Sequence, residues 1–234
     1  MKHLAKVLLS LAMLGTIVAQ AQTLLFDNFT KDSSLNTKLW TAGSPFLTAL
    51  AAASSSPAAT FVPPQLSFNN QFGMTMTGPT DDYEFTGVQS LSTFTPPFKV
   101  VTYVTAAGGT ANPFEIFLAS ADLTQFLTLD ANVCPCYDGF WVSAPNISQL
   151  WQLGEQFSPS ISPNFYAPYI VIINVNATGS ATITVENFVG TVLGKLSKLQ
   201  AGTGPFYLVL SQRIGLPDQT GPQYGDWFSV KVTP

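Results

Sequence analysis

The feature of this sequence that most constrains its fold is a regular alternation between short apolar runs and clusters of turn-forming residues. From Gln65 onward, runs rich in Val, Ile, Thr, Phe and Tyr recur roughly every 8–12 residues, separated by Gly, Pro, Asn, Asp and Ser. This spacing is typical of β-sandwiches and β-barrels. No segment keeps a helical period over three turns, and no long repeat is visible. The chain is therefore predicted to be an all-β protein with few helical residues.

The expected strands can be placed along the chain from these runs. They cover 66–69, 73–77, 83–91, 98–106, 114–120, 125–130, 139–144, 148–153, 169–175, 181–186, 188–193, 205–212 and 227–232. The clearest hairpin has its turn at 176–179, between two β-branched runs. The Ala-, Ser- and Pro-rich segment 42–64 is predicted to be a surface excursion within one domain, with a helical turn at 48–53.

The first 21 residues carry an export signal pattern. Lys2 and Lys6 give a positive start, residues 7–18 are almost wholly apolar, and Ala19-Gln20-Ala21 is a small-x-small cleavage pattern. We therefore expect a signal peptide at 1–21 and a single domain at 22–234. No second apolar stretch is long enough to span a membrane. The expected location is outside the cytoplasm, secreted or periplasmic, of a bacterium.

Removal of this leader narrows the available chemistry. The chain's one histidine, His3, leaves with it, and seven of the nine basic residues remain against 13 acidic ones, a formal charge of −6. Without histidine, Ser-His-Asp and Cys-His triads and histidine-based metal sites are excluded. A chain this acidic, with one arginine and no basic cluster, is a poor partner for nucleic acid.

Three segments resemble the secreted members of the concanavalin A-like lectin/glucanase superfamily. LFDNFTKDSSLNTKLW (25–40) resembles their opening strand, turn and buried Trp, and GVQSLSTFTPPFKVVTYVT (87–105) resembles a later long strand. The ending, GPFYLVLSQRIGL followed by GDWFSVKV, resembles their returning and closing strands. The resemblance implies a two-sheet antiparallel β-sandwich of the jelly-roll type, with one concave sheet that often holds a glycan.

Catalytic members of this superfamily carry Glu-x-Asp-x-x-Glu or Glu-x-Asp-x-Glu on one strand, which places the first two carboxylates on one face, with the second Glu as acid/base. None of the four glutamates here has an aspartate two residues later. The absence of the motif, together with the loss of histidine, favours a protein that is not an enzyme. A divergent glycoside hydrolase or lyase that uses Asp82, Glu84 or Glu115 is the alternative.

Aromatic residues near polar ones are the candidate ligand-binding groups, because their rings stack on sugars while polar neighbours bind hydroxyls. Strand alternation puts Trp141 on the face opposite to Phe140 and Val142. Near the end of the chain it puts Phe228, Val230 and Val232 inward and leaves Trp227 outward. The candidate ligand-binding residues are Tyr137, Asp138, Trp141, Trp151 and Trp227.

Both cysteines lie in Cys134-Pro135-Cys136. Two cysteines without histidine do not make a structural zinc site, and a redox pair is more often Cys-x-x-Cys at a helix start. In an exported protein we expect a tight disulfide between Cys134 and Cys136 that braces the loop before Trp141. No cofactor is expected. Calcium at Asp81, Asp82 or Asp138 is an alternative that needs no histidine.

The favoured function is that of a secreted, carbohydrate-binding, lectin-like protein without covalent chemistry, whose partner is a polysaccharide or glycan. The runner-up is the glycosidase or lyase described above. A third possibility is a structural envelope or matrix protein whose sheets contact other proteins, although the sequence names no protein partner.

Overall fold

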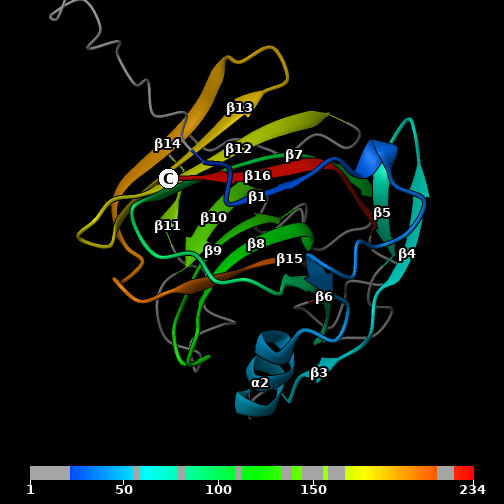
Figure 1. Cartoon of the computed structure of the whole chain (residues 1–234), viewed down its shortest axis with the longest axis horizontal. Coiled ribbons are helices and arrows are strands. Elements are labelled where there is room, and N and C mark those ends of the chain that lie inside the picture. The colour runs from blue at the N-terminus through cyan, green and yellow to red at the C-terminus, as the bar shows by residue number, and fades with distance from the viewer. Residues whose placement is uncertain are drawn as a thin grey trace, which may run out of the picture.

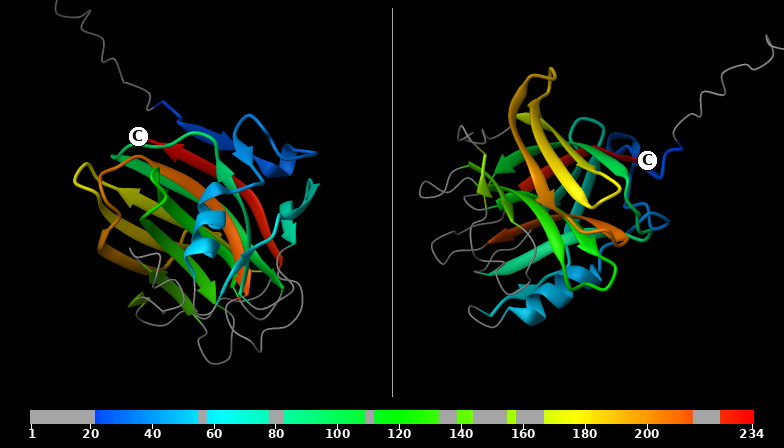
Figure 2. Two further views of the ribbon diagram at one scale, coloured as in Figure 1. Left: turned by 90° about the horizontal axis from the view of Figure 1, so that it is seen from below. Right: turned by 90° about the vertical axis from the view of Figure 1, so that its left-hand side faces the viewer.

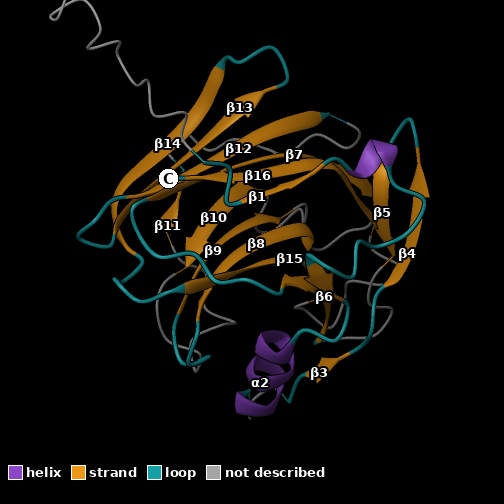
Figure 3. Ribbon diagram, viewed as in Figure 1, coloured by secondary structure: helices purple, strands orange, loops and turns teal. Residues whose placement is uncertain are grey.

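The computed structural model describes residues 22–54, 58–77, 83–108, 112–132, 139–143, 155–157, 167–214 and 224–234. Two large sheets lie face to face, and one short α-helix lies outside them (Figures 1 and 3). Every strand pair but one is antiparallel within the described residues, so the predicted all-β sandwich is confirmed.

The first sheet, which we call sheet A, contains eight strands. Across the sheet their order is β14 (Val192–Gln200), β13 (Ser180–Asn187), β12 (Pro168–Val175), β7 (Phe98–Gly108), β16 (Tyr224–Thr233), β5 (Gly73–Thr77) and β4 (Gln65–Asn69), with β1 (Leu25–Asp27) paired to β16. The first and last described strands are thus neighbours. The 3-10 helix η1 (Phe29–Lys31) follows β1.

The second sheet, sheet B, also contains eight strands. Their order is β11 (Glu155–Gln156), β10 (Gly139–Ser143), β9 (Phe126–Asn132), β8 (Asn112–Ser120), β15 (Phe206–Ile214), β6 (Glu84–Ser90) and β2 (Trp40–Thr41), while β3 (Thr60–Phe61) runs parallel to β6. Neighbours such as β8 and β15 are distant in sequence, so the middle of this sheet forms through long-range pairing.

The main core lies between the two sheets and is rich in aromatic rings. Phe114 of β8 contacts Trp227, Tyr169 and Phe140, with ring centroids 6.0–6.5 Å apart. All four residues are at most 4% exposed. At the edge of this core Trp40, predicted to be buried, donates its indole N–H to Asp27 over 2.7 Å. This contact ties the beginning of the chain to the sandwich.

Most of the strands expected from the sequence are present within a few residues of their predicted bounds. The turn at 176–179 is also confirmed, and its Asn176 side chain accepts hydrogen bonds from Thr178 and Ser180. The strand expected over 188–193 has the wrong bounds. Residues 188–191 form a turn, and β14 runs from Val192 to Gln200. The strand expected over 148–153 lies outside the described residues.

The helix α2 (Pro45–Ala53) packs on the side of sheet B that faces away from the main core (Figure 2). Pro45 sits in its first turn, and the Ser44 hydroxyl caps it by accepting the N–H of Leu47. Phe46, Leu47 and Leu50 are fully buried there. The helical turn expected at 48–53 is confirmed as part of α2. The segment 42–64 was expected to be a surface excursion, but its helix builds a second apolar cluster.

Candidate functional site

The outer face of sheet B, turned away from the main core, carries the densest set of chemically reactive side chains in the described structure. A row of direct cross-strand partners runs over it from Trp141 of β10 to Asp130 of β9, Glu115 of β8, Ser211 of β15 and Gly87 of β6. Residues in such register on neighbouring strands point to the same face. Sheet pairing therefore gathers residues that are far apart in sequence.

Trp141 occupies the face that the sequence predicted. Phe140 and Val142 are buried in the main core, at 0% and 3% exposure, whereas Trp141 is half-buried on the opposite side. Period-two alternation of strand side chains accounts for this arrangement. Ser143, two residues further along β10, is also half-buried on that side.

A buried ionic cluster lies next to Trp141. The guanidinium of Arg213 on β15 lies 2.5 Å from Asp130 through Nη2 and 2.8 Å from Glu115 through Nε. The first contact is a hydrogen bond; the second is too poorly aligned to be one, so it is electrostatic. Beside them Ser211 donates its hydroxyl to the Thr86 carbonyl over 2.8 Å.

Burial controls the charge state of this cluster. Glu115 is 0% and Asp130 1% exposed. Desolvation raises the pKa of Glu115 to about 8; Arg213 opposes the rise, and Asp130 adds to it. Burial also works against the charge on Arg213, but the two carboxyl groups outweigh it and raise the arginine pKa. Burial thus favours the protonated form of Glu115, whereas the two carboxyl groups favour the charged form of Arg213.

Neither Asp130 nor Arg213 was among the predicted site residues. Two signals for them exist in the sequence: Arg213 is its one arginine, and Asp130 alternates with the apolar Leu129 and Ala131. Each signal marks one residue and does not predict that the two side chains meet. They meet because β8 pairs with both β9 and β15, and local sequence patterns do not reveal this pairing.

The catalytic alternatives from the sequence take different positions. Glu115 belongs to the cluster. Glu84 is half-buried at the start of β6, opposite Ile214 and Thr60, and so lies outside the Trp141 row. Asp82 lies outside the described residues. On β9 the residues two before and two after Asp130 are Thr128 and Asn132, so this strand has no glutamate partner for its aspartate.

Helix α2 covers the remaining part of this face. Its apolar residues contact Phe85, Phe117, Phe126 and Val209, all at most 2% exposed. Gln89 of β6 fixes the helix start, because its side-chain oxygen accepts hydrogen bonds from the Ser44 hydroxyl and the Phe46 N–H, both at 3.0 Å. The outer face is thus divided into an apolar part under α2 and a polar part around the cluster.

The predicted outward position of Trp227 is wrong. Its side chain is 0% exposed in the main core, where its ring packs edge-on against Phe114. Strand β16 has a bulge opposite β7, where the register shifts between Trp227 and Ser229. The extra residue, Phe228, reverses the alternation, so Trp227 and Val230 both face inward.

Several predicted residues cannot be placed in the fold. Those that lie outside the described residues are Asp81, Asp82, Cys134, Cys136, Tyr137, Asp138 and Trp151. Their roles, including the disulfide and the calcium alternative, stay predictions. Among the described residues, no three His, Cys, Asp or Glu side chains are grouped closely enough to hold a metal ion. No described helix is long and apolar enough to cross a membrane.

Comparison with known proteins gives relatives by structure alone. No protein-family model and no curated protein matches the sequence. Among solved structures, the apo Crh5 transglycosylase superposes with a TM-score of 0.62 at 15% identity, covering 89% of this chain and 83% of that one. β-Agarase A in complex with oligoagarose gives 0.61 at 8% identity, covering 91% and 92%.

A lectin also shares this architecture. The UEA-II lectin complexed with galactose superposes with a TM-score of 0.54 at 11% identity, covering 91% of this chain and 99% of the lectin. At these identities the likeness concerns the fold and not the activity. The predicted resemblance is confirmed at that level: this chain has the concanavalin A-like lectin/glucanase fold.

Proposed function

We propose that this protein is an exported, lectin-like module that binds a polysaccharide at the Trp141 edge of the outer face of sheet B, without cleaving it. The observation that carries the proposal is the position of Trp141, half-buried beside a polar row on a sandwich of this fold. An indole face stacks on the C–H surface of a sugar ring, and adjacent hydroxyl and carboxylate groups bind its hydroxyls. Ser143 is the half-buried polar neighbour on the same face, whereas Asp130 is 1% exposed and bound to Arg213.

The state of the two carboxyl groups supports binding over catalysis. Glu115 and Asp130 both contact Arg213 and are almost completely buried. A retaining or inverting glycosidase needs two carboxyl groups that reach the glycosidic bond from opposite sides. Here Arg213 contacts both carboxyl groups. This arrangement is better suited to supporting the binding surface from below than to reaching a glycosidic bond.

A glycan-array screen of residues 22–234, followed by calorimetry on the best ligand, tests this proposal. We expect Trp141→Ala to weaken binding at least about tenfold, because loss of one stacking aromatic typically removes one or more kcal/mol. Phe188→Ala is the matched control, since Phe188 is 66% exposed on the β13–β14 turn of the other sheet. Equal affinity in Trp141→Ala and the unmodified protein would reject the site. Absence of any glycan ligand would favour the structural role instead.

One observation favours the glycosidase alternative. Glu115, whose pKa burial raises to about 8, stands directly opposite Asp130. A protonated carboxyl next to a second acidic group is how a general acid and its partner are arranged in glycosidases. A reducing-sugar assay on β-glucans and agarose tests it: turnover that disappears in Glu115→Gln would establish the enzyme and overturn the binding-only proposal.

A further inference from the structure

The outer face of sheet A, on the opposite side of the sandwich, carries three lysines. Lys99 of β7, Lys195 of β14 and Lys231 of β16 all alternate with core residues and so point outward. Lys231 and Lys99 are diagonal neighbours on adjacent strands, at about 7–8 Å. Lys195 lies in the same transverse row as Lys231, four strands away, or about 19 Å.

These cations lack acidic partners in the described part of the chain. Each ion pair found there involves Arg213, and no carboxylate lies within 4.0 Å of the three lysines. Of the acidic residues of this face, Asp226 lies toward the other end of the strands. Glu186 is two residues from Thr184, the direct partner of Lys195, so Lys99 and Lys231 are the two lysines without an acidic neighbour on this face of the adjoining strands. In a chain with 13 acidic and nine basic residues, this is a local concentration of positive charge.

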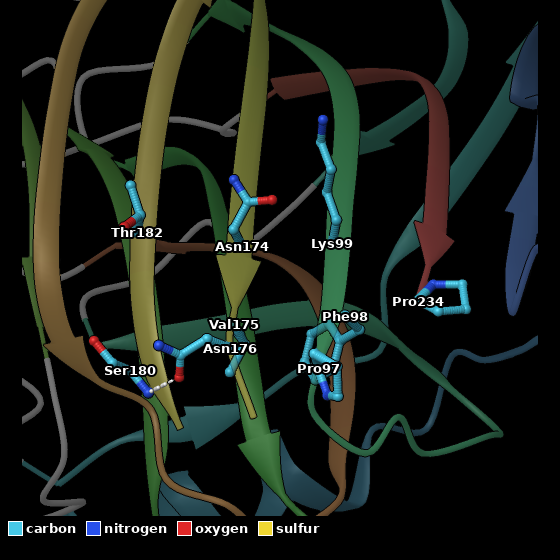
Figure 4. Close-up of a pocket in the computed structure, with 9 residues that line it drawn as sticks. All are labelled: Pro97, Phe98, Lys99, Asn174, Val175, Asn176, Ser180, Thr182 and Pro234. Carbon is cyan, nitrogen blue, oxygen red and sulfur yellow. Dashed lines mark hydrogen bonds between the residues drawn. The ribbon is translucent and has the colours of Figure 1, made fainter. Parts of the chain in front are cut away.

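A pocket of about 370 Å³ lies beside Lys99, which is the one of the three lysines that lines it (Figure 4). Thr182, Asn174 and Lys99 are direct cross-strand partners on β13, β12 and β7, and Figure 4 shows their side chains side by side. None of the three side chains forms a hydrogen bond or ion pair with another described residue, so a hydroxyl, an amide and an ammonium group are available together. Asn176, in contrast, is engaged with its own turn.

An aromatic ring flanks the same surface. Phe26 of β1 is the direct partner of Lys231 and is 55% exposed. Its exposed ring offers a stacking surface for the apolar face of a sugar ring. Two adjacent rows thus cross five neighbouring strands and β1. One row holds Phe26, Lys231 and Lys195, and the other holds Lys99, Asn174 and Thr182.

We propose that the outer face of sheet A is a second binding surface, specific for an anionic polysaccharide. Carboxylate or sulfate groups spaced along the polymer would contact Lys231, Lys99 and Lys195, while its hydroxyls contact Asn174 and Thr182. A polymer of this class fits better than a single anion because the lysines are spread over about 19 Å. It fits better than a duplex nucleic acid because Asn174 and Thr182, in the row of Lys99, offer uncharged donors and acceptors for sugar hydroxyls.

Biolayer interferometry on immobilised polymers tests the proposal with residues 22–234. Polygalacturonate and dextran sulfate are the carboxylated and sulfated probes, and uncharged dextran is the neutral one. We expect binding to one or both anionic polymers at 50 mM NaCl, and a loss of about tenfold or more at 500 mM NaCl, because salt screens exposed charges. The Lys99→Gln/Lys231→Gln double variant should lose about tenfold in affinity, a few-fold for each lysine.

The controls separate this surface from general charge and from the Trp141 site. Lys38→Gln removes an exposed lysine elsewhere and should leave binding unchanged. Equal losses in Lys38→Gln and the double variant, or equal binding to uncharged dextran, would overturn the proposal. Tighter binding to duplex DNA or to anionic phosphatidylserine vesicles than to both anionic polymers would overturn the choice of ligand. A loss in Trp141→Ala alone would assign the polymer to the other sheet.

Discussion

Replacement of Glu115 by glutamine should change how stability depends on pH while keeping the shape of the buried cluster. The folded state raises the pKa of Glu115 from 4.5 to about 8. Folded protein therefore holds a proton on this group that the unfolded chain releases at lower pH. The protonated Glu115 therefore contributes to the free energy of unfolding. This contribution is fully present below pH 4.5 and is lost as the pH rises through about 8. Glutamine stays neutral, so the variant lacks this loss.

The magnitude follows from the two pKa values. A difference of one pKa unit corresponds to about 1.4 kcal/mol, so the full effect of Glu115 is at most about 5 kcal/mol. Between pH 5 and pH 9, the unmodified protein should lose about 4 kcal/mol relative to Glu115→Gln. This is a large share of a typical unfolding free energy of about 5–15 kcal/mol. Asp27, with a pKa raised to about 6 mainly by burial, adds a slope that is common to both proteins and cancels in the difference.

Urea denaturation at pH 5, 7 and 9, followed by tryptophan fluorescence, measures this difference. Glu115→Gln should gain on the unmodified protein steadily as the pH rises. Glu186→Gln, a half-buried glutamate outside the cluster, should show no comparable trend. A difference that stays constant with pH would refute the reasoning. So would a Glu115→Gln variant that is less stable by several kcal/mol at pH 9, because Glu115 would then be an ionised, stabilising partner of Arg213.

Two further predictions concern the helix that covers sheet B. Gly87→Ala should lower the unfolding free energy by about 1–3 kcal/mol in denaturant melts, because an added Cβ would lie 2.7 Å from Leu47 and 2.6 Å from a carbonyl oxygen of β15; an unchanged melt would contradict this packing. Gln89→Ala should cost about 2–4 kcal/mol, since the Ser44 hydroxyl and the Phe46 N–H would lose their buried acceptor. Hydrogen exchange should then show faster exchange in α2 than in the core strands, and equal protection would argue against this role of Gln89.

The sequence was sufficient for those features that depend on local alternation. The strand around Trp141 was oriented correctly because Phe140 and Val142 keep a strict period of two. The same rule failed at Trp227, where the bulge at Phe228 reverses the faces. A bulge depends on pairing with a particular partner strand, and nothing in GDWFSVKV distinguishes a bulged strand from a regular one.

Helix α2 shows a second limit of local patterns. Residues 45–53 are Pro, Ala, Leu, Phe and Thr with no charged face, so no amphipathic period marks them. The helix forms because Ser44 caps it and because Phe46 and Leu50 find an apolar face on sheet B. That face exists only after strands from four parts of the chain have paired. Tertiary packing, more than intrinsic propensity, therefore decides this element.

The ionic cluster is the clearest case in which function and stability must be separated by experiment. A raised carboxyl pKa beside a second acidic group suits a general acid, but the same shift arises from burial alone. Glu115→Gln distinguishes these roles because its two readouts are independent. A structural carboxyl predicts altered pH dependence of unfolding with glycan binding retained, whereas a catalytic one also predicts lost turnover. Since Arg213 already contacts both carboxyl groups inside the fold, we expect the first outcome, with binding governed by Trp141.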